Sequence, residues 1–206
     1  MKPYYEDNAV MIYHGDCREI LPRVEADVLV TDPPYGLAER LHRPGPGEWS
    51  KLYGEGAPAW DRDAPENVVP LALRFPEAII FGGNYFPLPP ARGWLVWDKI
   101  VRKFSSGHCE LAWTNLDQPI RAFNFSHGAL ASEGKYHPTQ KPLALMRWAI
   151  GFTNGATVLD PFMGSGTTLR AAKDLGRKSI GIELDESYCE IAARRCAQDV
   201  LDMEAA

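Results

Sequence analysis

The sequence TVLDPFMGSGTTL, residues 157–169, predicts a β-strand, a tight glycine turn and the start of an α-helix in direct succession. Glycines at 164 and 166 allow a sharp turn before the helical pattern that starts at Thr167. They also let the backbone approach a ligand closely, and the amides at a helix start attract a carboxylate or a phosphate. The stretch therefore predicts a ligand-binding loop in an α/β protein.

The type of ligand is narrowed by what the loop lacks. A phosphate-binding P-loop has lysine after its last glycine, but this chain has Thr167 there. A dinucleotide-binding loop has a third glycine near position 169, but this chain has Leu169 there. The next predicted strand ends at Glu183, at about the distance where an acid meets ribose hydroxyls in nucleoside-binding folds. Loop and acid together favour an adenosyl group without a pyrophosphate. A plain strand–turn–helix with a solvated Glu183 is the alternative.

Short β-rich runs alternate with helical patterns along the chain, which is typical of a doubly wound, mostly parallel α/β sheet. In such sheets ligands bind beyond the carboxyl ends of the strands. Asp16 follows one of these strands, so it either accepts a hydrogen bond from an adenine amino group or caps the helix that begins at Cys17. The predicted strands are 9–13, 28–30, 78–81, 94–97, 157–159 and 179–182, and the predicted helices are 17–21, 143–152, 167–175 and 186–203.

The strand at 28–30 ends in a second motif, Asp32-Pro33-Pro34-Tyr35. Two consecutive prolines have no N–H to give to a sheet and hold φ near a fixed value, so the backbone leaves the sheet stiffly just after Asp32. The motif thereby presents a carboxylate and an aromatic ring at fixed spacing. A type I turn without a functional role is the alternative.

Composition and the N-terminal sequence predict a soluble globular protein of the cytosol. The 206 residues are 45% hydrophobic and 24% charged, an ordinary globular balance, and the length allows one domain with a full core. The start MKPYYEDNAV lacks the order of a signal peptide, and no uninterrupted apolar span predicts a membrane segment. Four cysteines without a C-x-x-C pair disfavour metal and disulfide sites. The Gly- and Pro-rich stretch of about 36–65 predicts a mobile surface loop beside Asp32.

Charge is unevenly distributed. The net charge is −5, but positive residues outnumber negative ones between Lys99 and Lys141. This excess indicates either a nucleic-acid-facing surface or a solvated face. Basic residues on loops commonly contact phosphates, and the residues proposed for that role are Arg40, Arg43, Lys51, Arg102 and Lys103.

Four motifs in this order resemble the β-group DNA amino-methyltransferases: DPPY at 32–35, FGGNYF at 81–86, HPTQKP at 137–142 and DPFMGSGTT at 160–168. The resemblance implies a seven-stranded sheet of the S-adenosylmethionine-dependent methyltransferase type, with circularly permuted motif order, in a single domain over 1–206. It also implies a reduced target-recognition region at about 99–136, because family members with long recognition inserts have far more sequence there.

The resemblance also assigns roles to residues. The catalytic residues would be Asp32, Pro33, Pro34 and Tyr35, while 97–99 and 108–110 match segments of the pocket wall. Residues implied to bind S-adenosylmethionine are Asp16, Cys17, His137, Thr139, Gln140, Lys141, Asp160, Phe162, Gly164, Ser165, Gly166, Thr167, Thr168, Glu183 and Leu184.

The implied activity is methylation of an exocyclic amino group of a base flipped out of duplex DNA, and aspartate at the head of DPPY leans toward adenine N6. Attack through cytosine C5 is disfavoured because the chain has no Pro-Cys pair, and Gly164-Ser165-Gly166 lacks the spacing of a hydrolase nucleophile. The alternatives are cytosine N4, an RNA base or a protein amide as substrate, and a catalytically silent nucleic-acid-binding module. We expect DNA as partner, with a homodimer and a restriction endonuclease as further candidates, in a bacterial or phage-infected cytoplasm.

Overall fold

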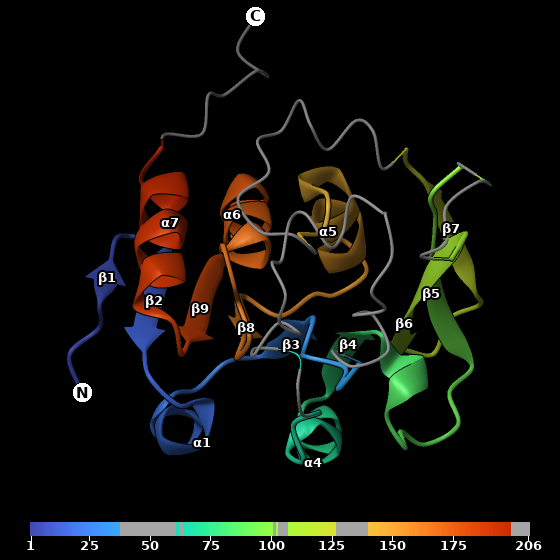
Figure 1. The fold of residues 1–206 in the computed structure, drawn as a ribbon, viewed down its shortest axis with the longest axis horizontal. Coiled ribbons are helices and arrows are strands. Elements are labelled where there is room, and N and C mark those ends of the chain that lie inside the picture. Colours follow the sequence, from blue (N-terminus) through green and yellow to red (C-terminus); the bar gives the residue numbers. More distant parts are fainter. Residues whose placement is uncertain (38–60, 62–63, 101, 103–106, 127–139, 199–206) are drawn as a thin grey trace, which may run out of the picture.

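The computed structural model describes residues 1–37, 61, 64–100, 102, 107–126 and 140–198. These residues form one nine-stranded sheet in the order β1-β2-β9-β8-β3-β4-β6-β5-β7, flanked by helices (Figure 1). The strands are β1 (Tyr5–Glu6), β2 (Val10–His14), β3 (Val28–Thr31), β4 (Glu77–Phe81), β5 (Gly93–Asp98), β6 (Cys109–Thr114), β7 (Arg121–Asn124), β8 (Thr157–Asp160) and β9 (Lys178–Glu183). The helices are α1 (Cys17–Ile20), α4 (Val68–Arg74), α5 (Leu143–Ile150), α6 (Thr167–Asp174) and α7 (Glu186–Ala197), with 3-10 turns η1 (Leu21–Arg23) and η3 (Gly83–Tyr85).

Strand directions confirm the mostly parallel, doubly wound fold. β2, β9, β8, β3 and β4 are parallel neighbours, β6 runs antiparallel between β4 and β5, and β5 is parallel to β7. The expected count of seven strands was too low, because the two-residue β1 and the largely exposed β7 extend the two edges. Neither edge strand has the buried alternation that marks a strand in a sequence.

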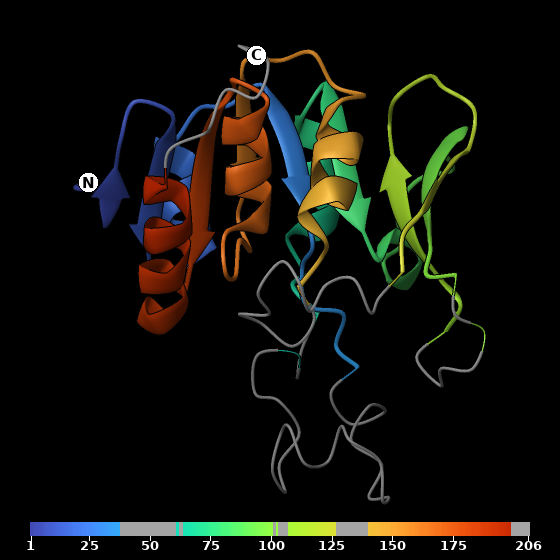
Figure 2. The same cartoon turned by 90° about the horizontal axis from the view of Figure 1, so that it is seen from above.

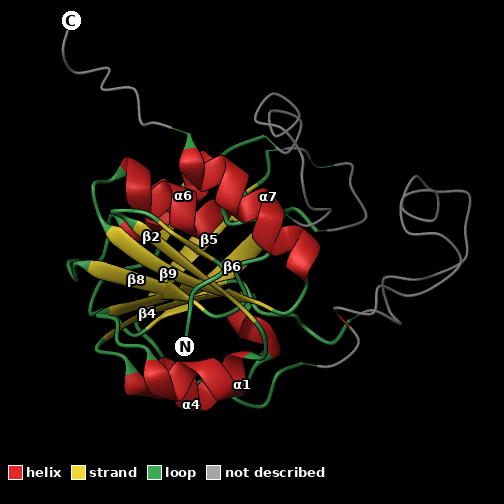
Figure 3. Cartoon of the chain, turned by 90° about the vertical axis from the view of Figure 1, so that its left-hand side faces the viewer, coloured by secondary structure: helices red, strands yellow, loops and turns green. Residues whose placement is uncertain are grey.

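Two helical layers cover the sheet. Helices α5, α6 and α7 lie on one face, and α1 and α4 lie on the other (Figures 1 and 3). Seen from above, α7, α6 and α5 stand side by side along their face (Figure 2). The glycine loop therefore leads from β8 into the middle helix of this row.

Strand β3 packs into both layers. Val28 and Val30 belong to the apolar cluster that includes Leu145 of α5, while Leu29 packs in the cluster of Ile20 and Leu71 on the other face. Successive side chains of a strand point to opposite faces, so a strand covered on both sides is apolar without interruption. This burial holds the residue that follows β3, Asp32, at a fixed place.

Several elements differ from the sequence-based expectation. Helix α4 was missed because a proline interrupts its pattern, although Pro70 lies in the first turn, where proline is tolerated. Strand β6 was missed because its first half is not buried. The predicted helix at 186–203 is observed to Ala197, and residues 199–203 lie outside the described part of the chain.

Substituting Gly166 tests the contact between the glycine loop and α7. Gly166 has φ +78°, and a Cβ there would lie 2.7 Å from the Cβ of Ala192. Because left-handed strain and steric overlap add, we expect Gly166→Ala to lower the free energy of unfolding by about 2–4 kcal/mol. Urea denaturation measures this loss.

Gly176→Ala is the matched control, since Gly176 has φ +68° but nothing within 4 Å of the added Cβ. Its expected loss is about 1 kcal/mol, from backbone strain alone. Equal losses in the two variants would contradict tight packing of the loop on α7.

Candidate active site

The carboxyl ends of β2, β9, β8 and β3 lie at one edge of the sheet, because these strands are parallel neighbours. Asp32 directly follows β3, the glycine loop follows β8, Glu183 ends β9, and Asp16 lies two residues beyond β2. The strand order thus brings Asp32 and Gly164 to the same edge, as expected from the sequence, although 132 positions separate them along the chain.

The hydrogen bonds that join these two motifs centre on Asp160. Thr31 Oγ1 donates to Asp160 Oδ1 (2.7 Å), the Phe162 amide donates to the same oxygen (3.1 Å), and Thr168 Oγ1 donates to Oδ2 (2.5 Å). The Asp160 residue is only 2% exposed. Burial raises the pKa of Asp160 to about 6, although the donors from Thr168 and Thr31 oppose this. Asp160 thus connects β3, β8 and α6.

The glycine loop is held against the end of β9. Glu183 Oε2 accepts from the Gly164 amide and Oε1 accepts from the Asp185 amide, both at 2.9 Å. Burial raises the pKa of Glu183. Gly164 has φ +49°, and nothing lies within 4 Å of the position a Cβ would take. The loop therefore has open space beside a partly buried carboxylate.

The hydroxyls that follow Gly164 are held by long side chains from other elements. Arg195 of α7 donates to the Ser165 carbonyl (2.6 Å), to Ser165 Oγ (3.0 Å) and to Thr167 Oγ1 (3.1 Å). Ser165 Oγ donates to Gln140 Oε1 (3.3 Å). The segment before α5 is thereby tied to the glycine loop, which brings Gln140 beside the predicted cofactor residues.

Asp16 caps α1. Its Oδ1 accepts from the Arg18 amide (2.8 Å), and its carboxylate also forms an ion pair with the Arg18 guanidinium. Cys17 Sγ accepts from Asn67 Nδ2 (3.5 Å), and Leu184 beyond β9 is largely exposed. The capping alternative for Asp16 is therefore observed, and its contact with an adenine stays a prediction.

Both oxygens of the Asp32 carboxylate have a donor in this structure. Lys141 Nζ donates to Oδ2 (2.5 Å), and the Tyr35 hydroxyl donates to Oδ1. Burial and the adjacent Asp32 hold the pKa of Tyr35 well above its ordinary value, so its hydroxyl remains a donor. The sequence analysis assigned Lys141 to the cofactor, whereas the structure places it against the catalytic motif.

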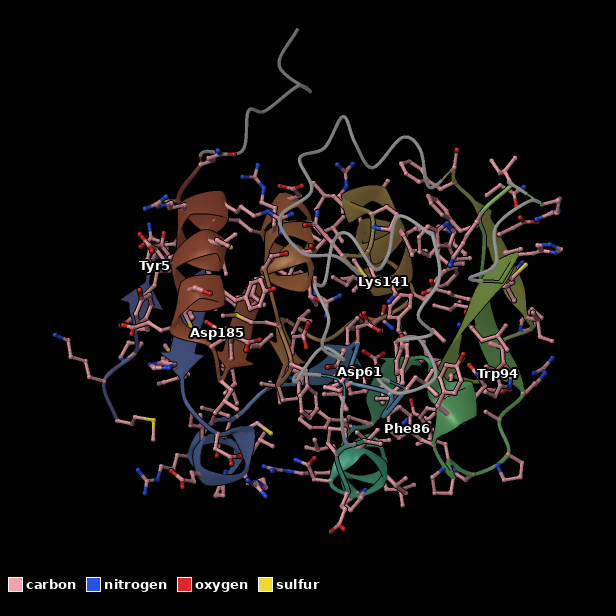
Figure 4. The ribbon with its side chains drawn as sticks, in the orientation of Figure 1. Tyr5, Asp61, Phe86, Trp94, Lys141 and Asp185 are labelled. Atoms are coloured by element: carbon pink, nitrogen blue, oxygen red, sulfur yellow. The ribbon has the colours of Figure 1, made fainter. Side chains whose placement is uncertain are left out.

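Asp61 is a site residue that sequence reasoning missed. Its carboxylate accepts from the amides of Tyr35 (2.6 Å), Gly36 (3.0 Å) and Leu37 (3.2 Å), and it is buried. In Figure 4, Asp61 is labelled over the central strands and Lys141 beside the lower end of α5. One carboxylate thus fixes the backbone that leaves the two prolines. Asp61 lies within the stretch predicted to be a surface loop, where nothing distinguished it from its neighbours.

Aromatic side chains surround the Tyr35 ring. Tyr85 stacks on it with centroids 4.9 Å apart and planes at 27°, and Phe86 contacts it edge-on at 6.4 Å. Gly82 has φ +65°, and a Cβ there would lie 2.1 Å from the Tyr35 ring. The FGGNYF segment is therefore built around this ring, and Tyr85 remains 49% exposed at the surface of the site.

A row of alternating charges extends from Asp32 across the sheet. Lys141 Nζ lies 3.2 Å from Glu110 Oε2, and Lys99 Nζ lies 2.7 Å from Glu110 Oε1. The side chains of both lysines are only 6% exposed. The local excess of positive charge in the sequence therefore includes two buried ion-paired lysines rather than a wholly solvated face.

Some of the predicted site residues lie outside the described part of the chain. Arg102 is described, and its guanidinium makes two hydrogen bonds of 2.6 Å to Asp98 while remaining largely exposed. Most of the loop at 36–65 and part of the region at 99–136 are not described. The predicted residues that fall there are Arg40, Arg43, Lys51, Lys103, His137 and Thr139.

Three further features bear on the type of site. Within the described ranges, no group of three or more His, Cys, Asp or Glu side chains is arranged to hold a metal ion. Among the helices described, none has the length and apolar character needed to cross a membrane. All four cysteines fall in the described part, and each is a free thiol.

The fold is that of an α/β protein, and the carboxyl edge of its sheet carries a glycine loop of the nucleoside-binding type next to the Asp32–Tyr35 motif. Comparisons with known proteins point to the same class. A family model described as DNA methylase matches residues 93–194. The type II methyltransferase M.ScaI of Streptomyces caespitosus is 26% identical over 253 residues, covering 94% of this chain and 83% of the relative. The type II methyltransferase M2.DpnII of Streptococcus pneumoniae is 26% identical over 248 residues, covering 94% and 92%.

A solved structure is also similar. The crystal structure of the M1.HpyAVI–SAM complex has a TM-score of 0.58 and 25% identity, and the match covers 92% of this chain and 100% of that chain. The family model, the two relatives and the solved structure all indicate a methyltransferase. This chain is therefore similar, in sequence and in fold, to N6/N4 DNA methyltransferases.

The buried Asp160 predicts a pH dependence of stability. Its pKa in the folded protein, about 6, lies above the ordinary value of 3.8, so the folded state binds this proton more tightly than the unfolded chain. Protonation of Asp160 therefore contributes about 3 kcal/mol to the free energy of unfolding. This contribution is present in full below pH 4 and is lost as the pH rises to about 6. Because Asn does not ionise, Asp160→Asn removes this dependence.

Urea unfolding of the wild type and of Asp160→Asn between pH 4 and 7 measures the difference. We expect the stability of the wild type relative to the variant to fall across this range. Asp117→Asn, at a largely exposed carboxylate, is the control and leaves the profile unchanged. A pH-independent difference between wild type and Asp160→Asn would refute the assignment.

Proposed function

We propose that this protein transfers the methyl group of S-adenosylmethionine to the exocyclic amino group of a base in DNA, with adenine N6 as the target. One observation carries the proposal. The Thr31–Asp160 hydrogen bond joins the strand that leads to Asp32 to the strand that opens into the glycine loop. An acceptor for an amine and a loop suited to an adenosyl ligand therefore belong to the same edge, and the similarity to DNA methyltransferases supports both roles.

The glycine loop fits S-adenosylmethionine. Because Gly164 has no side chain, space is open beside the loop, and the adjacent Glu183 is a partly buried acceptor of the kind that binds ribose hydroxyls. The bound cofactor supplies a methyl group on a positively charged sulfur. The described residues proposed to hold it are Asp16, Cys17, Gln140, Asp160, Phe162, Gly164, Ser165, Gly166, Thr167, Thr168, Glu183 and Leu184.

Asp32 addresses the chemical difficulty of the reaction. The lone pair of an exocyclic amine is delocalised into the base, so the amine is a weak nucleophile. Hydrogen bonds from its two N–H groups to the Asp32 carboxylate and to a rigid carbonyl such as that of Pro33 would localise the lone pair and stabilise the positive charge that develops on nitrogen. Preorganised groups of this kind contribute about 3–4 kcal/mol each.

Tyr35 provides the surface for the base. A target amine cannot be reached inside a duplex, so the base must be flipped out, and stacking on an aromatic ring offsets about 1–3 kcal/mol of the lost base stacking. The Tyr35 hydroxyl now donates to Asp32 Oδ1. In the proposed complex the amine N–H takes over as the donor to that oxygen.

Adenine is proposed over cytosine because the motif begins with a carboxylate, the choice that leans toward adenine in the family. Cytosine N4 presents the same NH₂ geometry, so it is the competing substrate. RNA bases and protein amides carry the same group as well. The assay below includes each of these outcomes.

The setting follows from the relatives, both of which are type II methyltransferases of bacteria. We propose a single methyltransferase domain that acts on DNA in a bacterial cytoplasm, within a restriction-modification system. The loop at about 36–65 and the reduced recognition region at about 99–136 would contact the duplex. Arg102 is the described residue proposed for phosphate contact, where it would exchange Asp98 for a phosphate.

The product of the reaction tests the proposal. The full chain is incubated with methyl-labelled S-adenosylmethionine and unmethylated duplex DNA, RNA or protein, and the DNA is digested to nucleosides. We expect label in N6-methyldeoxyadenosine. Label in N4-methyldeoxycytidine would overturn the choice of adenine, and label only in RNA or protein would overturn DNA. Binding of DNA without any labelled product would favour a silent binding module.

Asp32→Asn tests the role of the carboxylate while preserving its size. We expect kcat to fall by about 100- to 1,000-fold, because the variant loses a charged acceptor aimed at the developing positive charge. The Kd for S-adenosylmethionine, measured by calorimetry, stays within about twofold. Asp117→Asn is again the matched change at an exposed site and retains full activity. A loss of cofactor affinity as large as the loss of rate would assign Asp32 to binding or folding.

A further inference from the structure

Lys141 lies between two carboxylates that come from distant parts of the chain. Its Nζ is 2.5 Å from Asp32 Oδ2 and 3.2 Å from Glu110 Oε2, and Glu110 Oε1 is 2.7 Å from Lys99 Nζ. Asp32 follows β3 and Lys141 precedes α5. Glu110 lies on β6, and Lys99 follows β5. Four alternating charges are therefore assembled by the tertiary fold at the edge that carries the catalytic motif.

Such a row is costly to bury. Each charge removed from water costs several kcal/mol, and well-packed apolar side chains are often at least as stabilising as a buried ion pair. Here the lysines also contact ring faces, with Lys141 Nζ 5.8 Å from the Tyr35 centroid and Lys99 Nζ 5.3 Å from the Trp97 centroid. Stability alone gives little reason to keep this arrangement, so a role in the reaction is the better explanation.

We infer that Lys141 is a positioning residue, which orients the Asp32 carboxylate toward the target amine, and that Glu110 and Lys99 hold Lys141 in place. This inference rests on the proposed function. With Oδ2 held by Lys141, Oδ1 is the oxygen that the amine can take over from the Tyr35 hydroxyl. The carboxylate then needs no reorientation when the base enters.

Electrostatics supports the same role. Burial raises the pKa of Asp32, and the Lys141 ammonium opposes that rise. Burial acts in the same direction on Glu110, but Lys141 and Lys99 hold the pKa of Glu110 below its ordinary value. Burial acts to lower the pKa of Lys141, but Asp32 and Glu110 hold it well above its ordinary value. The lysine therefore stays charged and favours the ionised acceptor.

The groups that bear on the titration of Asp32 come from every neighbouring element. Lys141 and Tyr35 bond to it directly, and the Glu110 and Asp160 carboxylates act on it through space. Loss of the cation removes the interaction that favours the carboxylate, so Asp32 retains its proton to higher pH. An activity that needs ionised Asp32 would then begin at higher pH.

The test compares Lys141→Met, Lys141→Arg, Glu110→Gln and the control Lys178→Met, which replaces an exposed lysine at the start of β9. We expect kcat to fall about 100-fold in Lys141→Met and about tenfold in Glu110→Gln, with the Kd for S-adenosylmethionine within about twofold. The acid limb of the kcat–pH profile moves to higher pH in Lys141→Met, and Lys141→Arg restores its position. In Glu110→Gln the limb moves to lower pH, because a like charge that raises the pKa of Asp32 is removed. Combining Lys141→Met with Glu110→Gln costs no more than Lys141→Met alone, because Glu110 acts through Lys141.

A second readout does not depend on activity. The carboxyl resonance of Asp32 in ¹³C-aspartate-labelled protein, assigned by its absence in Asp32→Asn, is titrated in each folded variant. We expect it to titrate at higher pH in Lys141→Met, which loses the neighbouring cation, and at lower pH in Glu110→Gln, which loses a neighbouring like charge, than in Lys178→Met. If the wild type methylates nothing, the proposed function fails while this titration still judges the arrangement.

Two results would overturn the inference. An unchanged Asp32 titration with normal kcat in Glu110→Gln would make the row of charges purely structural. A cofactor Kd in Lys141→Met that rises as much as kcat falls would make Lys141 a cofactor-binding residue. Should Lys141→Met fail to fold, Glu110→Gln decides, because it leaves both groups of the Asp32–Lys141 pair in place.

Discussion

The hydrogen bond from Thr31 to Asp160 is the interaction on which the site depends. It joins two parallel strands, β3 and β8, just where each ends. The Asp160 carboxylate also accepts a hydrogen bond from Thr168 in the first turn of α6. Because the bond is buried, leaving either partner unsatisfied would be costly. The strand that presents Asp32 and the loop that begins after Asp160 are thereby kept in register, and the proposed acceptor and cofactor loop keep a fixed separation.

Beyond this bond, the catalytic motif is rigid because its backbone and side chains are held from different directions. Asp61 accepts the amides that follow the prolines, Tyr85 and Phe86 contact the Tyr35 ring, and Lys141 holds one Asp32 oxygen. Such preorganisation matters for an amine that is a poor nucleophile, since an acceptor already in place does not have to be reorganised during the reaction.

Local patterns predicted much of this molecule. The strand, turn and helix around Gly164 and Gly166 were predicted because positive φ values and helix starts leave a signature within a few residues. The uninterrupted apolar run of β3 likewise indicates a strand that is buried on both faces, as observed. Strand β6 and helix α4 were missed, since a half-exposed strand and a proline in a first helical turn weaken the periodic signal.

The sequence by itself determined the resemblance to DNA amino-methyltransferases, the mostly parallel α/β class, and the residues that follow the strands at the carboxyl edge. Only the tertiary structure decided that Lys141 pairs with Asp32, that Glu110 and Lys99 continue this pair inward, and that Asp61 holds the backbone after Tyr35. The physical reason is that a motif reflects short-range backbone geometry, whereas an ion pair between residues 109 positions apart depends on strand order and on which side chains lose water together.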